Sequence, residues 1–300
     1  MTQKQENTGV FYVLLGAAMW GIFPVLINKG TQNIHPVIFA AVTTLLAACG
    51  CFFYALAKGD LKELKNRKAY SSLIMITLCV VIIPYLLFFT GSKMTNGLNS
   101  SMLLMSEIIF TLIVTAIVGE KTTIEKLIGA MGIFFGACFM LYKGSFSLNL
   151  GDLLIIASTI TYPIGNFYTK KALNHVSPST ILFIRFALGG IVIFIIAILV
   201  SPINNVFTEV KDNFFLVLFT GFVLLGIGKV IWYEGLKRLD ISKAISIGMT
   251  FPLFSLILLI GYFKETPSVN QCIGISIMLI GIFFSIKRTS VNPSLTRYAK

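Results

Sequence analysis

The apolar residues of the chain fall into ten long runs separated by short polar segments. The runs cover residues 10–28, 36–57, 71–90, 97–118, 125–142, 152–169, 179–200, 214–235, 244–263 and 268–286. Each is close to the roughly 20 residues that an α-helix needs to cross a bilayer. The runs are about twice as long as the strands of a membrane barrel and do not alternate polar with apolar residues. The pattern predicts an all-α polytopic membrane protein with ten transmembrane helices.

The composition agrees with a membrane environment. Apolar residues make up 56% of the chain and charged residues only 12%, with a mean hydropathy of +0.87. Water cannot solvate such a surface, whereas lipid can. The formal net charge of +12 then indicates topology and anionic headgroups rather than nucleic-acid binding. The five cysteines lie within apolar runs and lack the paired spacing of a zinc site, so we expect no metal and no cofactor.

The basic residues predict the orientation in the membrane. Five of them fall between the second and third runs: Lys58, Lys62, Lys65, Arg67 and Lys68. Placing this segment in the cytoplasm puts 17 Lys and Arg residues inside and five outside. Cytoplasmic loops carry the excess of basic residues in membrane proteins. We therefore expect a protein of the cytoplasmic membrane with both termini in the cytoplasm, including the basic tail at 287–300.

The two halves of the chain align with each other. At an offset of 144 residues, Gly91, Lys93 and Met105 match Gly235, Lys237 and Met249. At an offset of 145, Glu120, Gly129 and Gly136 match Glu265, Gly274 and Gly281. At an offset of 139, Pro24 matches Pro163. The repeats would span 10–142 and 152–286. Because each repeat holds five spans, an odd number, the second must enter the membrane from the opposite side. The sequence predicts two inverted five-helix repeats, the architecture that permits alternating access.

Short motifs add a family resemblance. They are the Trp20-Gly21 pair with Pro24, and the stretch 119–121 followed by Gly129 and Gly136. Together with their second-half counterparts, these residues resemble EamA-type members of the drug/metabolite transporter superfamily. The resemblance covers the chain from about residue 10 to 286. It implies ten helices around a central cavity, and export or import of small metabolites.

Charged residues inside the runs are the first candidates for function, because a charge in hydrocarbon is costly. Glu107 lies near the middle of the fourth run, and Lys229 lies six residues from the cytoplasmic end of the eighth. We predict that both bind substrate. A buried structural ion pair is the alternative for Glu107, and snorkelling or pairing with Glu234 is the alternative for Lys229.

Helix-weakening residues precede two polar positions that match in the repeat. Gly228 comes directly before Lys229, and Pro84 directly before its counterpart Tyr85. Such breaks free backbone groups and turn half-helix dipoles toward a ligand. The resemblance also places aromatic side chains of the first, third, sixth and eighth runs around the cavity. The three that lie deepest, and that we predict to bind substrate, are Trp20, Tyr85 and Tyr162.

Other charges lie closer to the cytoplasmic ends of their runs. Arg185 and Glu234 are in this position, and Glu120 follows the fourth run. We predict a cytoplasmic network of these residues that either stabilises the helix ends or gates the cavity.

The substrate hypothesis follows from charge pairing. Lys229 would bind a carboxylate, Glu107 an ammonium, and the aromatic rings an apolar part, which favours an amino acid or related compound. A quaternary amine or other organic cation, held by Glu107 and the aromatic residues, is the alternative, and it leaves Lys229 without a role. A membrane enzyme or lipid-handling protein would need a nucleophile, a metal cluster or long interfacial loops, which the sequence lacks.

Two properties stay open at this stage. Glu107 could exchange a proton with substrate, yet uncoupled diffusion fits the same residues. The Gly132 to Gly136 GxxxG motif either joins two copies of the chain or packs helices within one copy, so both monomer and homodimer fit.

Overall fold

The computed structural model describes residues 3–117, 124–141, 149–236, 238–239, 247–248 and 250–286, and these residues contain helices and no strand. The helices are α1 (Gln3–Gly30), α2 (Pro36–Lys58), α3 (Tyr70–Thr77), α4 (Ile83–Lys93), α5 (Gly97–Met102), α6 (Glu107–Ile117), α7 (Ile124–Leu141), α8 (Leu150–Ile160), α9 (Tyr162–Ala172), α10 (Pro178–Val200), α11 (Ile203–Asp212), α12 (Phe214–Leu218), α13 (Gly228–Leu236), α15 (Phe251–Leu256) and α16 (Val269–Ile286). Short 3-10 segments are η1 (Asp60–Lys65), η2 (Arg67–Ala69) and η4 (Leu103–Ser106). Wider π-helical segments are η3 (Leu78–Ile82), η5 (Phe219–Ile227) and η6 (Ile257–Tyr262).

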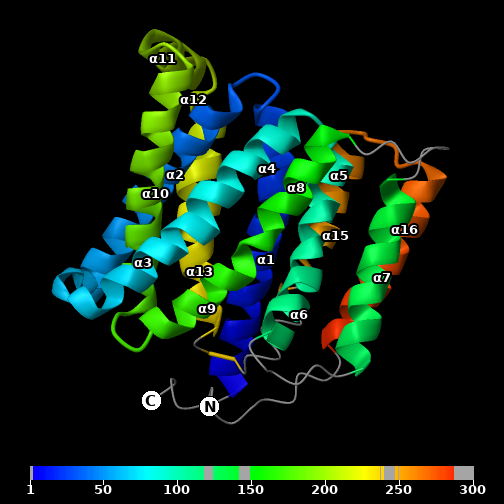
Figure 1. Ribbon diagram of the computed structural model, residues 1–300, viewed down its shortest axis with the longest axis horizontal. Coiled ribbons are helices and arrows are strands. Elements are labelled where there is room, and N and C mark those ends of the chain that lie inside the picture. Colours follow the sequence, from blue (N-terminus) through cyan, green and yellow to red (C-terminus); the bar gives the residue numbers. More distant parts are fainter. Residues whose placement is uncertain are drawn as a thin grey trace.

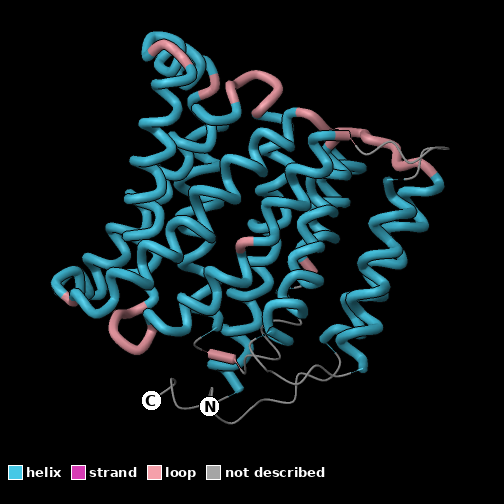
Figure 2. Tube along the Cα trace, viewed as in Figure 1, coloured by secondary structure: helices cyan, strands magenta, loops and turns pink. Residues whose placement is uncertain are grey.

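The helices run roughly side by side, and the turns between them gather at the two ends of the bundle (Figures 1 and 2). Six helical segments are long and apolar enough to cross a membrane: Gln5–Gly30, Pro36–Lys58, Arg67–Lys93, Gly97–Val114, Pro178–Val200 and Phe214–Leu236. Three shorter apolar helices are Leu127–Phe139, Phe251–Tyr262 and Val269–Gly281. The predicted helical, multi-pass membrane protein is confirmed. The count of ten spans stays a prediction.

The start of α1 and the end of α16 lie at the same end of the bundle, the lower end in Figure 1. This arrangement fits the prediction that both termini share one side of the membrane. The tail at 287–300 lies outside the described residues.

Helix irregularities occur at the two matched positions where the sequence predicted weak helix. The π-helical segment η3 precedes Pro84, and η5 precedes Gly228. Proline lacks an amide N–H and clashes with the carbonyl of the preceding turn, and glycine loses more conformational entropy in a helix than other residues. A π-helical turn absorbs such a defect and often marks a functional site. At the offset of 144, residues 78–82 correspond to residues 222–226, which lie within η5.

One element was not predicted. The segment between the seventh and eighth runs, which we expected only as a connection, contains the short helix α11 at the top of Figure 1. Its Phe207 is exposed, whereas Val206 is buried. Glu209 accepts a hydrogen bond of 2.7 Å from the backbone N–H of His35 at the start of α2. A helix of ten residues is too short and too polar to register as a hydrophobic run.

Glycines bring α7 and α16 into close contact. A Cβ atom at Gly136 would lie 2.6 Å from the carbonyl oxygen of Gly274, and one at Gly281 would lie 2.7 Å from that of Gly129. A Cβ at Gly132 would lie 2.9 Å from the Cα of Gly281. The GxxxG motif therefore packs two helices of the same chain. The oligomeric state stays untested.

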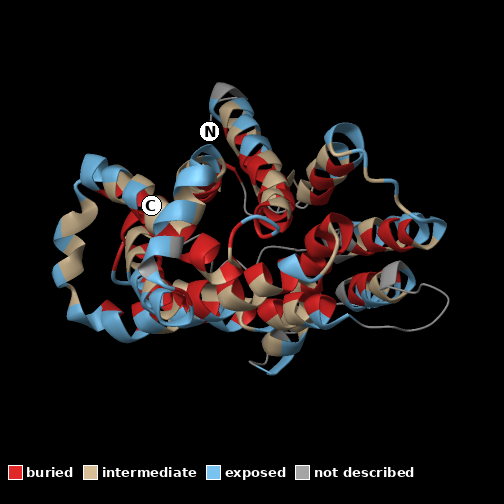
Figure 3. Cartoon of the chain, turned by 90° about the horizontal axis from the view of Figure 1, so that it is seen from above, coloured by how far each residue is buried: buried red, intermediate tan, exposed pale blue. Residues whose placement is uncertain are grey.

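Buried residues gather toward the middle of the bundle, while exposed residues lie mostly on its outer faces (Figure 3). The fully buried core includes Phe39, Phe89 and Phe186, from α2, α4 and α10. Large exposed apolar residues such as Leu199 and Phe215 suit a surface that faces lipid rather than water.

Candidate functional site

The candidate site is a group of charged and aromatic side chains that we call the central cluster: Trp20, Tyr85, Glu107, Tyr162, Arg185 and Lys229. Local breaks in the helices position several of them. Glu107 is the first residue of α6, directly after the 3-10 segment η4, and Lys229 is the second residue of α13, directly after η5. Tyr162 begins α9 beyond the bend that separates it from α8.

The ammonium group of Lys229 rests on the ring of Trp20. Its Nζ lies 3.4 Å from the ring centroid. Phe23 stacks on Trp20, with ring centroids 5.2 Å apart and planes 7° apart. This is a cation–π contact, which is strongest where water is scarce. Trp20 lies ten residues, or about 15 Å, before the end of α1. The side chain of Lys229 therefore packs on α1 well away from the end of that helix. Its role in substrate binding stays a prediction.

Glu107 faces the second half of the chain. Its carboxylate accepts a hydrogen bond from the side chain of Asn166 and interacts electrostatically with Lys229. The sequence analysis did not select Asn166. It follows Tyr162 by four residues in α9, so both side chains lie on one face of that helix, and this spacing was the available signal.

Arg185 lies in the central cluster. Its side chain is 7% exposed and interacts electrostatically with Tyr85, Tyr162 and Lys229. The guanidinium carbon lies 4.7 Å from the ring centroid of Phe186. Its Nε has no hydrogen-bond partner among the described residues. Arg185 is seven residues beyond the start of α10, or about 10 Å along the axis, which is deeper than a helix-end position.

Glu234 has different neighbours. It accepts a hydrogen bond from the hydroxyl of Tyr54, lies 2.8 Å from Nη1 of Arg238, and lies 3.6 Å from Nζ of Lys58. We call these four residues the Glu234 network; it joins the ends of α2 and α13. The sequence predicted one network that contains both Glu234 and Arg185. In the structure, Glu234 belongs to the Glu234 network and Arg185 to the central cluster. Glu120, the third residue of that group, lies outside the described residues.

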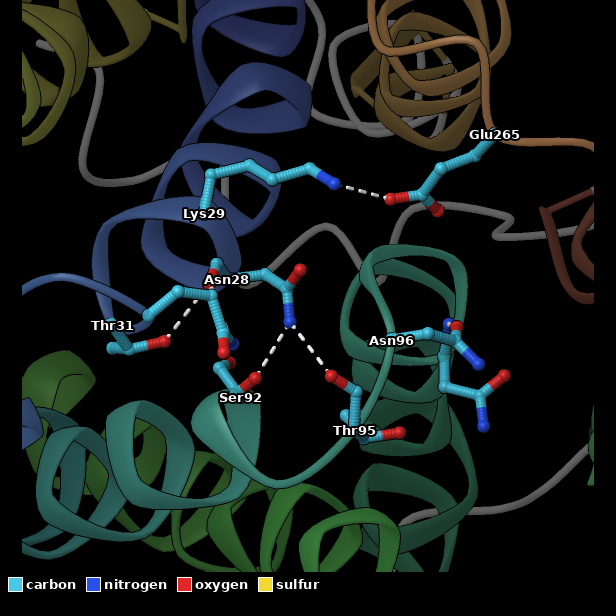
Figure 4. Close-up of polar contacts among 9 residues, drawn as sticks. Asn28, Lys29, Thr31, Ser92, Thr95, Asn96 and Glu265 are labelled. Atoms are coloured by element: carbon cyan, nitrogen blue, oxygen red, sulfur yellow. Dashed lines mark hydrogen bonds and ion pairs between the residues drawn. The ribbon is translucent and has the colours of Figure 1, made fainter.

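The opposite end of the bundle holds an ion pair that the sequence analysis missed. Nζ of Lys29 lies 2.6 Å from a carboxylate oxygen of Glu265 and 4.8 Å from the ring centroid of Phe263 (Figure 4). The pair joins the end of α1 to the segment after η6, across 236 residues of sequence. We call it the latch. The sequence places Lys29 and Glu265 in loops just outside the apolar runs, and in loops no local pattern indicates which residue will form an ion pair with which.

Hydrogen bonds beside the latch fix the same end. The buried side-chain amide of Asn28 donates to the carbonyl oxygens of Ser92, at 2.6 Å, and Thr95, at 3.0 Å (Figure 4). Thr95 in turn donates to Asp152 at the start of α8. These contacts tie α1 and α8 to the turn between α4 and α5.

The central cluster can bind an ionic organic molecule. It offers cations for a carboxylate, a carboxylate for an ammonium group, and aromatic faces for an apolar part. In the part of the chain that the structure describes, no group of three or more His, Cys, Asp or Glu side chains could hold a metal ion.

Comparisons with known proteins bear on the family and the fold. The model of the EamA-like transporter family matches residues 7–142 and 149–287. A "Probable amino-acid metabolite efflux pump" of Escherichia coli (strain K12) is 24% identical over 91% of this chain and 93% of its own. An "Uncharacterized transporter" of Methanothermobacter thermautotrophicus is 24% identical over 92% of this chain and 85% of its own. A solved crystal structure, 16% identical, superposes with a TM-score of 0.66 over 97% of this chain and 100% of that chain, which shows a shared fold.

Proposed function

Because the chain belongs to the EamA-like transporter family, we propose that this membrane transporter moves an amino acid or a related metabolite across the cytoplasmic membrane by alternating access. The observation that carries the proposal is the ammonium group of Lys229 on the ring of Trp20, inside the bundle, with Glu107 near enough to interact with Lys229 electrostatically. Two relatives, from Escherichia coli and Salmonella typhimurium, carry the name of an amino-acid metabolite efflux pump.

The chemistry of binding follows from these partners. The α-carboxylate of an amino acid would bind Lys229, and its ammonium group would bind Glu107. Each contact is a charge-assisted hydrogen bond, which is stronger than a neutral one. The substrate thus replaces the attraction between the two side chains with two new ion pairs, and this exchange lowers the cost of desolvating all four groups.

Alternating access draws support from the likeness of the two halves. The family model matches the chain twice, in ranges of similar length. The π-helical segments η3 and η5 occupy corresponding positions. Residues matched at an offset of 145 also contact each other reciprocally, because Gly129 meets Gly281 and Gly136 meets Gly274. A pseudo-two-fold axis between α7 and α16 would produce such contacts, as inverted repeats require.

The latch supports the same mechanism. It ties the two halves together at the end of the bundle where α1 ends. We propose that this end faces outward and that the structure corresponds to an outward-closed state. Opening the outer side would then require the Lys29–Glu265 pair to separate.

The organic-cation alternative fits the geometry less well. A quaternary amine would need the face of Trp20, which the ammonium group of Lys229 already occupies at 3.4 Å. A second cation at that ring would also be repelled by Lys229.

Binding tests the proposal. Purified protein would be heated with each of a panel of amino acids and quaternary amines, since a ligand that binds the native state raises its apparent stability. We expect stabilisation by amino acids that is lost in Glu107→Gln and in Lys229→Met. Lys93→Gln, an exposed lysine far from the cluster, is the matched control and should keep it. Stabilisation by quaternary amines that survives in Lys229→Met would refute the amino-acid site.

A further inference from the structure

The central cluster holds unequal charges. Arg185 and Lys229 are basic, and among the described residues Glu107 is the carboxylate that interacts with Lys229, so the ionised cluster carries one excess positive charge. The interaction between Arg185 and Lys229 is repulsive. An uncompensated charge among membrane-spanning helices is costly, and a bound anion relieves that cost. A zwitterionic amino acid adds no net charge and leaves the excess in place.

Arg185 is the group without a counterion. No ion pair with a carboxylate involves it among the described residues, and its buried Nε has no hydrogen-bond partner. Its other neighbours are the phenols of Tyr85 and Tyr162, the thiol of Cys51 and the ring of Phe186. A buried donor without an acceptor is destabilising, and the planar guanidinium matches the two oxygens of a carboxylate.

We infer that the substrate is an acidic amino acid or a closely related compound with one more carboxylate than ammonium groups, and that Arg185 binds its second carboxylate. The inference rests on the proposed function, which assigns the α-carboxylate to Lys229 and the ammonium group to Glu107. A substrate of net charge −1 neutralises the cluster. Loading it would therefore allow the two halves to rearrange around a site without net charge.

The position of Arg185 suits this assignment. It projects from α10, Lys229 from α13 and Glu107 from α6, so three helices present the three charged groups. Tyr162 interacts electrostatically with both Arg185 and Glu107, and so belongs to the same group of side chains.

The test compares L-glutamate with L-glutamine, which have nearly the same shape and differ by one carboxylate charge. Affinities would be measured by thermal stabilisation of the purified full-length transporter. We expect the unmodified protein to bind glutamate at least tenfold more tightly than glutamine. In Arg185→Gln the ratio should fall to about one while glutamine still binds, and Arg185→Lys should keep part of the preference. If the role of Arg185 were purely structural, its substitution would instead weaken the binding of both ligands equally.

Three results would overturn the inference. Equal binding of the two ligands by the unmodified protein is the first, and it needs no variant, so it applies even if Arg185→Gln does not fold. The second is a preference for glutamate that persists in both Arg185 variants. In either case neutral amino acids would still bind, so the proposed function would stand. The third is the absence of binding by any amino acid, acidic or neutral, which would refute the proposed function and this inference together.

Discussion

Removing either charge of the latch should open the outer end of the transporter more often. The pair spans 2.6 Å between Nζ of Lys29 and Oε1 of Glu265, and the two side chains are 33% and 22% exposed. Exposed ion pairs contribute up to about 1 kcal/mol, and a cation–π contact such as that with Phe263 adds a similar amount. Solvent screening reduces both contributions, so the latch should stabilise the closed state by about 1 kcal/mol, or roughly fivefold in population.

Labelling of a buried cysteine measures this change. Ser101 lies one helical turn below Gly97, and a Cβ atom at Gly97 would lie 3.1 Å from the Glu265 carboxylate. The side chain of Ser101 is fully buried and its hydroxyl has no hydrogen-bond partner among the described residues, so Ser101→Cys should be well tolerated. In a background with the five native cysteines replaced by alanine, a membrane-impermeant thiol reagent should label this cysteine about five times faster in Lys29→Gln and in Glu265→Gln.

A double-mutant cycle separates the pair from general charge effects. Lys29→Gln combined with Glu265→Gln should label no faster than either single variant, and the charge swap Lys29→Glu with Glu265→Lys should restore slow labelling. Lys93→Gln removes an exposed positive charge at the same end and serves as the control. Unchanged labelling in both single variants, or an equal increase in the Lys93 variant, would refute the latch.

Three further predictions concern packing and the opposite end of the bundle. Gly136→Val should lower the stability of the protein by about 1–3 kcal/mol, since the added carbons meet the backbone of α16. Gly261→Ala is the control, because a Cβ atom at Gly261 meets nothing within 4 Å. An equal loss of stability in both variants would contradict this packing. Asn28→Ala should lower the stability of the protein by about 2 kcal/mol, because the carbonyl oxygens of Ser92 and Thr95 lose their donor. Gln32 is exposed, so Gln32→Ala should change the stability little. Thermal unfolding of the two variants measures the difference. Glu234→Gln should speed labelling of cysteines from the end opposite the latch, because Lys58 and Arg238 lose their ionic contact and Tyr54 loses a charged acceptor. An unchanged rate would exclude a gating role for that network.

Much of the fold was readable from the sequence because the membrane imposes simple rules. Helices must be long and apolar, so the runs predicted the helical bundle. The weak helix positions before Tyr85 and Lys229 were also predictable, since proline and glycine act locally. That Glu107 and Lys229 each need a partner was also predictable, since an isolated charge in hydrocarbon is costly.

The remaining contacts depend on which way each helix faces. The segment that forms α10 is apolar on nearly every side, so its sequence does not indicate that Arg185 points toward Tyr162 and Lys229. The latch joins residues 236 positions apart, and no local pattern relates Lys29 to Glu265. The hydrogen bond between Asn166 and Glu107 likewise forms only when α9 packs beside α6.

Counterflow in proteoliposomes tests the central claim most directly. Vesicles loaded with an unlabelled amino acid would take up the same radiolabelled compound from outside. This uptake requires alternating access, but it requires neither a proton gradient nor knowledge of the physiological direction of transport. The account predicts amino-acid counterflow that is abolished by Glu107→Gln and by Lys229→Met and retained by Lys93→Gln. Undiminished counterflow in the first two variants would show that the central cluster does not bind the substrate.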